Sequence, residues 1–134
     1  MKLCSKLFAC SFLIFYSVIN FSCNNSSTVF RKIDRSTSGI TFTNTITESD
    51  SINPIDVENM YNGGGVGIGD FNNDGLPDIY FAGNLVSNKL YINKGNFKFE
   101  DVTDKAKVGG EGKWAKGISV IDINSDGLPD IYIS

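Results

Sequence analysis

The 134-residue sequence contains no histidine, which excludes histidine-containing zinc sites, Ser-His-Asp triads and histidine general bases. It has no excess of basic residues either, with 12 Lys and Arg against 15 Asp and Glu and no basic cluster. Nucleic-acid binding is therefore disfavoured, because that function needs a positively charged surface. The sequence also lacks a long apolar run. The longest, from Leu7 to about Ile19, is shorter than the ~20 residues that a membrane-spanning helix needs.

Residues 1–22 have the pattern of a secretory signal peptide, which we expect to be a helix that is cleaved off. Lys2 and Lys6 precede the apolar run, and Ser22 is a small residue before the predicted cleavage point. Cys23 then opens a polar tether, residues 23–28. This order resembles the lipobox of bacterial lipoproteins, in which the cysteine is acylated, although Asn20 stands where that family usually has leucine. The alternatives are ordinary secretion with a chance cysteine, or an uncleaved anchor. Either way we predict an extracytoplasmic protein, as a bacterial outer-membrane lipoprotein or in secreted form.

The few cysteines agree with this prediction. Cys4 and Cys10 lie in the signal, so Cys23 is the one cysteine expected in the mature chain and no disulfide can form within it. A single thiol at an extracytoplasmic N-terminus is better explained by acylation than by redox chemistry. Loss of Lys2 and Lys6 would leave 10 basic and 15 acidic residues, a net charge of −5.

Two oxygen-rich motifs stand 52 residues apart. The first is Asp70-x-Asn72-x-Asp74-Gly75-Leu76-x-Asp78, and the second is Asp122-x-Asn124-x-Asp126-Gly127-Leu128-x-Asp130. Residues 65–82 and 117–134 share ten identities in eighteen positions. Each motif places carboxylate or amide oxygens at every second position, with a glycine that permits a sharp turn. Ca²⁺ binds about 6–8 such oxygens in flexible geometry, so the motifs predict two calcium sites.

Two other kinds of structure share parts of these motifs. An EF-hand needs an acidic residue at loop position 12 and flanking helices, but Phe81 and Ile133 occupy that position and the flanking residues are typical of strands. Metal-free Asp-Asn-Gly turns remain the alternative. Three aspartates in one tight turn repel one another unless a cation or an arginine neutralises them, and no arginine is near in sequence.

The strand pattern predicts an all-β fold. Strands are expected over 66–69, 78–82, 88–93 and 97–102, joined by tight turns, and again over 117–121 and 131–133. Residues 63–116 would form the first repeat, one four-stranded antiparallel blade, and residues 117–134 the truncated start of a second. Residues 29–62 would supply N-terminal strands, over 29–34 and 39–44, and a loop. A period near 50 indicates a partial β-propeller, and because closure takes about four to eight blades we expect an N-terminal fragment of a longer protein.

The loops resemble the FG-GAP/VCBS repeats of integrin-α-type β-propellers. The order of signal, tether, residues 38–42 and residues 62–66 further resembles bacterial ASPIC/UnbV proteins of the cartilage-acidic-protein type, whose C-terminal domain is absent here. The resemblance implies side-chain ligands at loop positions one, three, five and nine and a carbonyl ligand at position seven. These are Asp70, Asn72, Asp74, Leu76 and Asp78 in the first loop, and Asp122, Asn124, Asp126, Leu128 and Asp130 in the second.

Together these features predict a calcium-binding repeat protein anchored to the cell envelope. It would act without catalysis as a binding or adhesion module for an unknown protein or glycan, with structural Ca²⁺ within its blades and a membrane anchor at Cys23. The alternative is the N-terminal part of a propeller-based extracytoplasmic hydrolase or lyase with its active site in further blades. Tyr61, Lys113 and Trp114 are the unusual polar and aromatic residues between repeats that this alternative would use, but as lone residues they are better explained as packing or rim residues. A short lipoprotein that oligomerises to cover its open strand edges is a third possibility.

Overall fold

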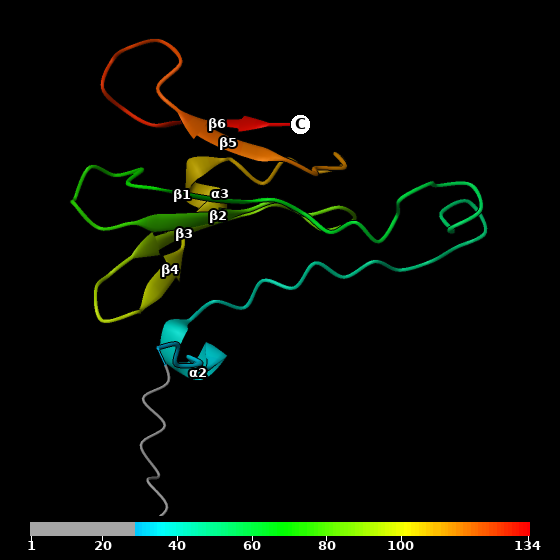
Figure 1. Cartoon of the computed structure of the whole chain (residues 1–134), viewed down its shortest axis with the longest axis horizontal. Helices are drawn as coiled ribbons and strands as arrows, with labels where there is room; N and C mark the ends of the chain where they lie inside the picture. The colour runs from blue at the N-terminus through cyan, green and yellow to red at the C-terminus, as the bar shows by residue number, and fades with distance from the viewer. Residues whose placement is uncertain (1–28) are drawn as a thin grey trace, which may run out of the picture. The chain divides into compact units, whose positions relative to one another are not determined.

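The computed structural model describes residues 29–134 and is built mainly of β-strands (Figure 1). The elements below belong to one compact unit, residues 33–134. They are α2 (Arg35–Ser38), β1 (Val66–Gly69), β2 (Asp78–Phe81), β3 (Lys89–Asn93), β4 (Phe99–Asp101), α3 (Thr103–Ala106), β5 (Ile118–Ile121) and β6 (Asp130–Ile133). The predicted signal peptide and the tether with Cys23 lie outside the described residues. Within residues 29–134 no helix has the length and apolarity needed to cross a bilayer.

The first repeat forms the predicted four-stranded antiparallel sheet, in the order β1-β2-β3-β4. Short strands with alternating side chains follow one another through tight turns, which is the pattern that gives neighbouring antiparallel pairs. The turn between β3 and β4 is closed by the N–H of Lys94, which donates to the Lys98 carbonyl at 2.7 Å. The prediction of one four-stranded antiparallel blade is confirmed.

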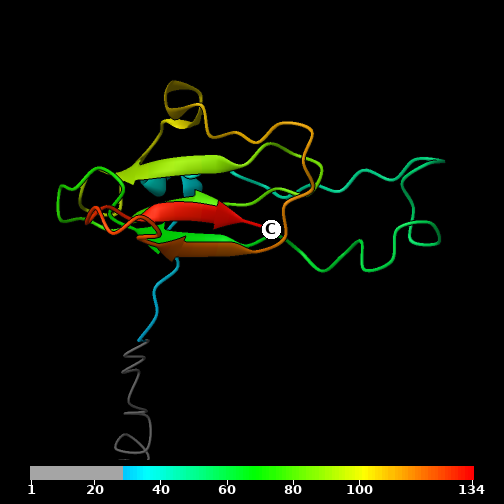
Figure 2. The ribbon, with the colours of Figure 1, turned by 90° about the horizontal axis from the view of Figure 1, so that it is seen from above.

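The second repeat begins in the same way, and its two strands pair in the same register as β1 and β2. Ile118 lies opposite Ile133, as Val66 lies opposite Phe81. Ile118 and Ile131 pack against a buried cluster of Tyr80, Leu90 and Ile92 on the first sheet. Figure 2, seen from above, shows β5 and β6 lying over that sheet. The start of a second blade is therefore confirmed as well.

The close approach of β1 and β5 depends on glycine. A Cβ atom at Gly67 would lie 2.6 Å from Cγ2 of Ile118 and 2.9 Å from Cγ2 of Val120. Those separations are shorter than van der Waals contact, so the isoleucine and valine of β5 fill the space that a side chain at position 67 would occupy. The glycines of β1 thus set the spacing between the repeats.

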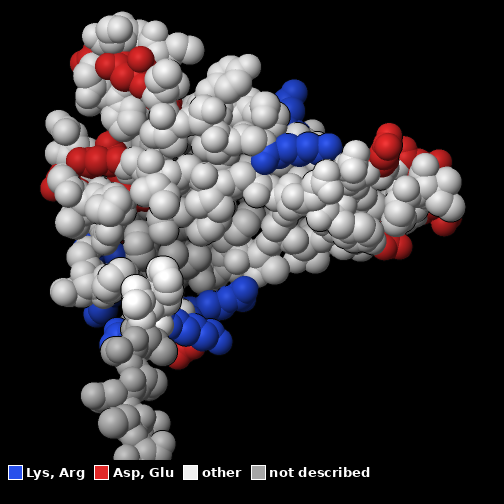
Figure 3. All heavy atoms as spheres, viewed as in Figure 1, with Lys and Arg blue, Asp and Glu red and all other residues white. Residues whose placement is uncertain are grey.

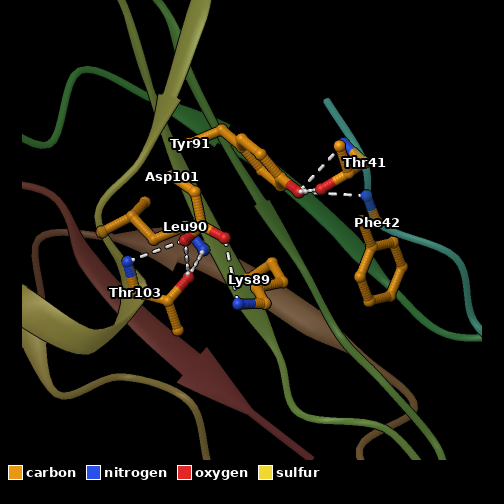
Figure 4. A network of polar contacts seen from close by, with 7 residues as sticks. All are labelled: Thr41, Phe42, Lys89, Leu90, Tyr91, Asp101 and Thr103. Carbon is orange, nitrogen blue, oxygen red and sulfur yellow. Dashed lines mark hydrogen bonds and ion pairs between the residues drawn. The ribbon is translucent and has the colours of Figure 1, made fainter. Parts of the chain in front are cut away.

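The two N-terminal strands predicted over 29–34 and 39–44 do not form. Residues 35–38 are the short helix α2, and residues 39–44 run extended without joining a sheet. The N–H groups of Thr41 and Phe42 donate to the hydroxyl oxygen of Tyr91, at 3.2 and 3.0 Å, instead of to a strand (Figure 4). Phe42 also stacks on Phe81 with ring centroids 5.0 Å apart. The apolar residues on which the strand prediction rested lie instead across the face of β2 and β3.

The short helix α3 directly follows β4 and was not predicted from the sequence. Thr103, its first residue, is buried and accepts a hydrogen bond from the N–H of Leu90 at 2.9 Å while its hydroxyl donates to Asp101 at 2.5 Å. A single-turn helix with this anchoring carries too few residues to show a helical period in the sequence.

Candidate metal-binding loops

Both oxygen-rich loops join the first two strands of a repeat. The first spans the gap between β1 and β2, the second that between β5 and β6, and Figure 1 shows them at the same end of the two sheets. Figure 3 shows two separate groups of carboxylates at that end. The repeat in the sequence is thus a repeat in space, because each loop leaves one strand and enters its antiparallel partner.

The first loop is shaped by hydrogen bonds from its backbone to its own side chains. The N–H of Asp74 donates to Oδ1 of Asp70 at 3.0 Å and to Oδ1 of Asn72 at 3.1 Å. The N–H of Gly75 donates to Oδ2 of Asp70 at 2.8 Å, and the N–H of Leu76 donates to Oδ1 of Asp74 at 2.9 Å. The amide of Asn72 donates to Oδ2 of Asp74 at 2.8 Å. These contacts gather three of the predicted ligand side chains into one turn.

The second loop repeats every one of these contacts. The N–H of Asp126 donates to Oδ1 of Asp122 and to Oδ1 of Asn124, both at 3.0 Å, and the amide of Asn124 donates to Asp126 at 2.9 Å. Gly127 and Leu128 donate to Asp122 and Asp126, each at 2.8 Å. Gly75 and Gly127 both have φ of 84°, a left-handed value that favours glycine. The motif therefore encodes a loop conformation and not merely a turn.

The last aspartate of each loop differs between the repeats. Asp78 is fully buried, and its carboxylate accepts hydrogen bonds from the N–H of Phe71 at 2.9 Å and from the N–H of Asn93 at 2.8 Å. Asp130 accepts the equivalent loop bond from Ile123 at 3.1 Å and is half-buried. Asp78 thus ties the loop to β3 as well as to β2. The role of Asn93 was not predicted, because the contact is made by its backbone and leaves no signal in residue type.

The loop carboxylates accept hydrogen bonds from backbone N–H groups and from the side-chain amides of Asn72 and Asn124, and no Lys or Arg of the described residues pairs with them. Across residues 29–134 the ion pairs are Lys89–Asp101 at 2.9 Å and Lys94–Glu100 at 3.0 Å, and neither involves a loop aspartate. In the same residues no three acidic, cysteine or histidine side chains converge as a ready metal site. The oxygens of Asp70, Asp74 and Asp78 accept hydrogen bonds from backbone N–H groups. What the loops hold in common is an all-oxygen donor set, the chemistry that Ca²⁺ prefers.

Comparison with known proteins bears on this repeat. Residues 70–133 match the family described as FG-GAP-like repeat. The match starts at the first aspartate of the first loop and ends in β6, so it takes in both loops and covers 64 of the 134 residues. It supports an FG-GAP repeat protein and agrees with the resemblance seen in the motifs. No curated protein and no solved structure matches the chain.

A second cluster of polar side chains, formed by Lys89, Asp101 and Thr103, lies on the first sheet and stabilises the fold (Figure 4). Burial raises the pKa of the Asp101 carboxyl, but hydrogen bonds from Thr103 and Lys89 outweigh that effect and hold the pKa below its usual value. The hydrogen bond to Asp101 in turn raises the pKa of Lys89. These contacts join β3, β4 and α3.

The residues named for an enzymatic alternative are not gathered into one site. Tyr61 is exposed and donates a hydrogen bond to Glu48, whereas Lys113 and Trp114 line a hollow of ≈190 Å³ beside Asn84. The indole N–H of Trp114 is buried and has no hydrogen-bond partner among residues 29–134. The lining of that hollow is Asn84, Leu85, Val86, Gly112, Lys113 and Trp114, of which Lys113 has an ionisable side chain.

Proposed function

We propose that each loop binds one Ca²⁺ and that the repeats act as a non-enzymatic binding module outside the cytoplasm. The observation that carries the proposal is the duplication of one loop geometry, with the same oxygen-bearing side chains and the same hydrogen bonds 52 residues apart. The residues that would hold the ions are Asp70, Asn72, Asp74, Asp78 and the Leu76 carbonyl, and Asp122, Asn124, Asp126, Asp130 and the Leu128 carbonyl.

The charge of the loops supports a bound cation. Each loop concentrates three aspartates, and in the described residues none of them pairs with Lys or Arg. Backbone N–H groups carry only partial charge and leave much of the repulsion between neighbouring carboxylates in place. A divalent ion would remove that repulsion. Asn72 and Asp74 are exposed, so an ion can reach them from solvent.

Calcium in this proposal has a structural role. Asp78 is the first residue of β2, whereas Asp70 directly follows β1, so an ion shared by the two would fasten the paired strands at one end. It would leave the faces and the other loops of the repeats free to contact a protein or glycan ligand. Attachment to the envelope through an acylated Cys23, and kinship with bacterial ASPIC/UnbV proteins that carry VCBS repeats, complete the proposal and rest on the sequence patterns.

Calcium titration calorimetry on charge-neutralising variants tests the proposal. Asp74→Asn removes one negative charge but keeps an Oδ1 that can accept the Leu76 N–H, so the loop backbone keeps its support. We expect two calcium ions per wild-type chain, one for Asp74→Asn or Asp126→Asn, and none for the double variant. Glu111→Gln, which removes an exposed charge outside the loops, is the matched control and should still bind two. A wild-type chain that takes up no calcium at millimolar concentration would refute the proposal, as would an unchanged stoichiometry in the double variant.

A further inference from the structure

Three places in the sequence have an asparagine or aspartate directly before a glycine. They are Asn62–Gly63, Asp74–Gly75 and Asp126–Gly127. In such a pair the main-chain nitrogen of the glycine can attack the side-chain carbon Cγ of the preceding residue, because glycine has no Cβ to block the approach. The first residue of every pair is exposed, so access of water does not distinguish the three places.

Hydrogen bonds hold the two pairs in the calcium loops away from this reaction. The N–H of Gly75 donates to Oδ2 of Asp70, and the N–H of Gly127 donates to Oδ2 of Asp122, both at 2.8 Å. The side chain of Asp74 is held as well, since its Oδ1 accepts the N–H of Leu76 at 2.9 Å. A glycine nitrogen in these loops must give up a bond to a charged acceptor before it can attack, which slows the reaction.

The pair Asn62–Gly63 has no such bonds. Among residues 29–134 the N–H of Gly63 donates to no acceptor, and the side chain of Asn62 makes no hydrogen bond. A Cβ atom at position 63 would have no other heavy atom within 4 Å, so the space beside this glycine is open. The side chain of Asn62 can therefore rotate onto the nitrogen of Gly63 without breaking a contact.

The carbonyl of Gly63, in contrast, takes part in a buried contact. It accepts a hydrogen bond from Nδ2 of Asn84 at 3.1 Å, and the same Nδ2 donates to the Ala115 carbonyl at 3.0 Å. Asn84 is almost fully buried and also exchanges two hydrogen bonds with Asn44, at 2.6 and 3.0 Å. One side chain thus joins the residue before β1 to the segments around residues 44 and 115. A change in the main chain at position 62 would reach this junction directly.

We propose that Asn62–Gly63 undergoes spontaneous deamidation in the folded protein and that the main isomer formed withdraws the Gly63 carbonyl from Asn84. The nitrogen of Gly63 bonds to Cγ of Asn62, the Cγ–Nδ2 bond breaks, and ammonia leaves with the proton of the Gly63 N–H. Water then opens the cyclic imide. Attack at Cγ gives aspartate, whereas attack at the main-chain carbonyl carbon gives isoaspartate, in which the main chain runs through Cγ and is longer by one carbon. This inference does not rest on calcium binding.

Rates of deamidation in two variants of the 134-residue chain test the inference. Asp74→Asn and Asp126→Asn each place asparagine before a glycine whose N–H is hydrogen-bonded. The variants are incubated in mildly alkaline buffer with chelator, and peptide mass spectrometry follows each position. Position 62 should react at least about tenfold faster than position 74 or 126, because the bond to a charged acceptor must break at the latter two. In urea the rates should become similar. Equal rates in the folded chain, no reaction at position 62, or a difference that persists in urea would overturn the inference.

Thermal unfolding tests the effect on the Asn84 junction. The wild-type chain, incubated until position 62 is mostly modified, should melt about 4–8 °C below the fresh chain, since the isoaspartyl form loses a buried hydrogen bond. Asn62→Asp is the matched control, because it adds the same charge with a main chain of normal length and should melt like the fresh wild type. Asn62→Gln should keep its melting temperature through the same incubation. Equal melting of the modified chain and Asn62→Asp would show that Asn84 keeps its contact and would overturn that part of the proposal.

Discussion

Asp78 and Asp130 occupy the same position of the repeat, yet replacing each by asparagine should have very different consequences. The Asp78 carboxylate is fully buried and satisfies two backbone donors, Phe71 and Asn93. Asparagine has a single acceptor oxygen, so Asp78→Asn would keep one of these bonds and turn an NH₂ group toward the other N–H. A buried donor left without an acceptor costs about 1–3 kcal/mol, and bonds to a charged acceptor are worth about 1.5–3 kcal/mol each.

The expected loss of unfolding free energy for Asp78→Asn is therefore about 2–4 kcal/mol. For a unit of roughly 100 residues this lowers the melting temperature by about 10–20 °C. Asp130 accepts one N–H, from Ile123, and is half-exposed, so asparagine can keep that bond and water can solvate the rest. Asp130→Asn should cost less than about 1 kcal/mol.

Urea unfolding in chelator, followed by the fluorescence of Trp114, measures both losses without any contribution from calcium. Trp114 is the single tryptophan of the sequence, so the signal reports one site near the junction of the repeats. Circular dichroism at the same urea concentrations checks that the transition is common to the whole unit. Similar losses for the two variants, or a loss under about 1 kcal/mol for Asp78→Asn, would refute the reasoning from burial and hydrogen-bond number.

Three further outcomes follow from the packing and the polar contacts. Tyr91→Phe should cost about 1–2 kcal/mol in urea unfolding and speed hydrogen exchange in residues 41 and 42, since both N–H groups lose their acceptor; unchanged exchange would contradict this. The pKa of Asp101 is lowered in the folded state. Its contribution to folding stability is therefore fully present above its pKa in the unfolded chain, about 3.9, and is lost as the pH falls through its pKa in the folded chain. Wild type should thus lose stability more steeply below about pH 4 than Asp101→Asn, and parallel pH profiles would argue against the assignment. Gly67→Ala should lower the free energy of unfolding by about 1–3 kcal/mol, because the added Cβ meets Ile118. Measured by thermal unfolding, Gly67→Ala should cost less when Ile118 is also replaced by alanine than it does in the wild-type chain. Strictly additive losses would show that the two residues do not clash.

The repeat and its strands follow from local patterns in the sequence. Oxygen-bearing residues at every second position followed by Ile-Tyr identified both loops. Alternating residues between tight turns located the ends of β1 to β6 to within two residues, and the largest difference is at the start of β4. These features are local, because turn chemistry and strand alternation act over a few neighbouring residues. The calcium ligands, the acylated Cys23 and the ligand of the module remain predictions.

Tertiary contacts decided what the N-terminal segment and the ends of the loops do. Residues 39–44 have the composition of a strand, but the hydroxyl of Tyr91, some 50 residues away, takes the N–H groups that a neighbouring strand would have taken. Asp78 and Asp130 share one motif, but in the described residues the N–H of Asn93 donates only to the first of them. Which partner satisfies a backbone group depends on segments that meet through folding, and the local sequence carries no record of that choice.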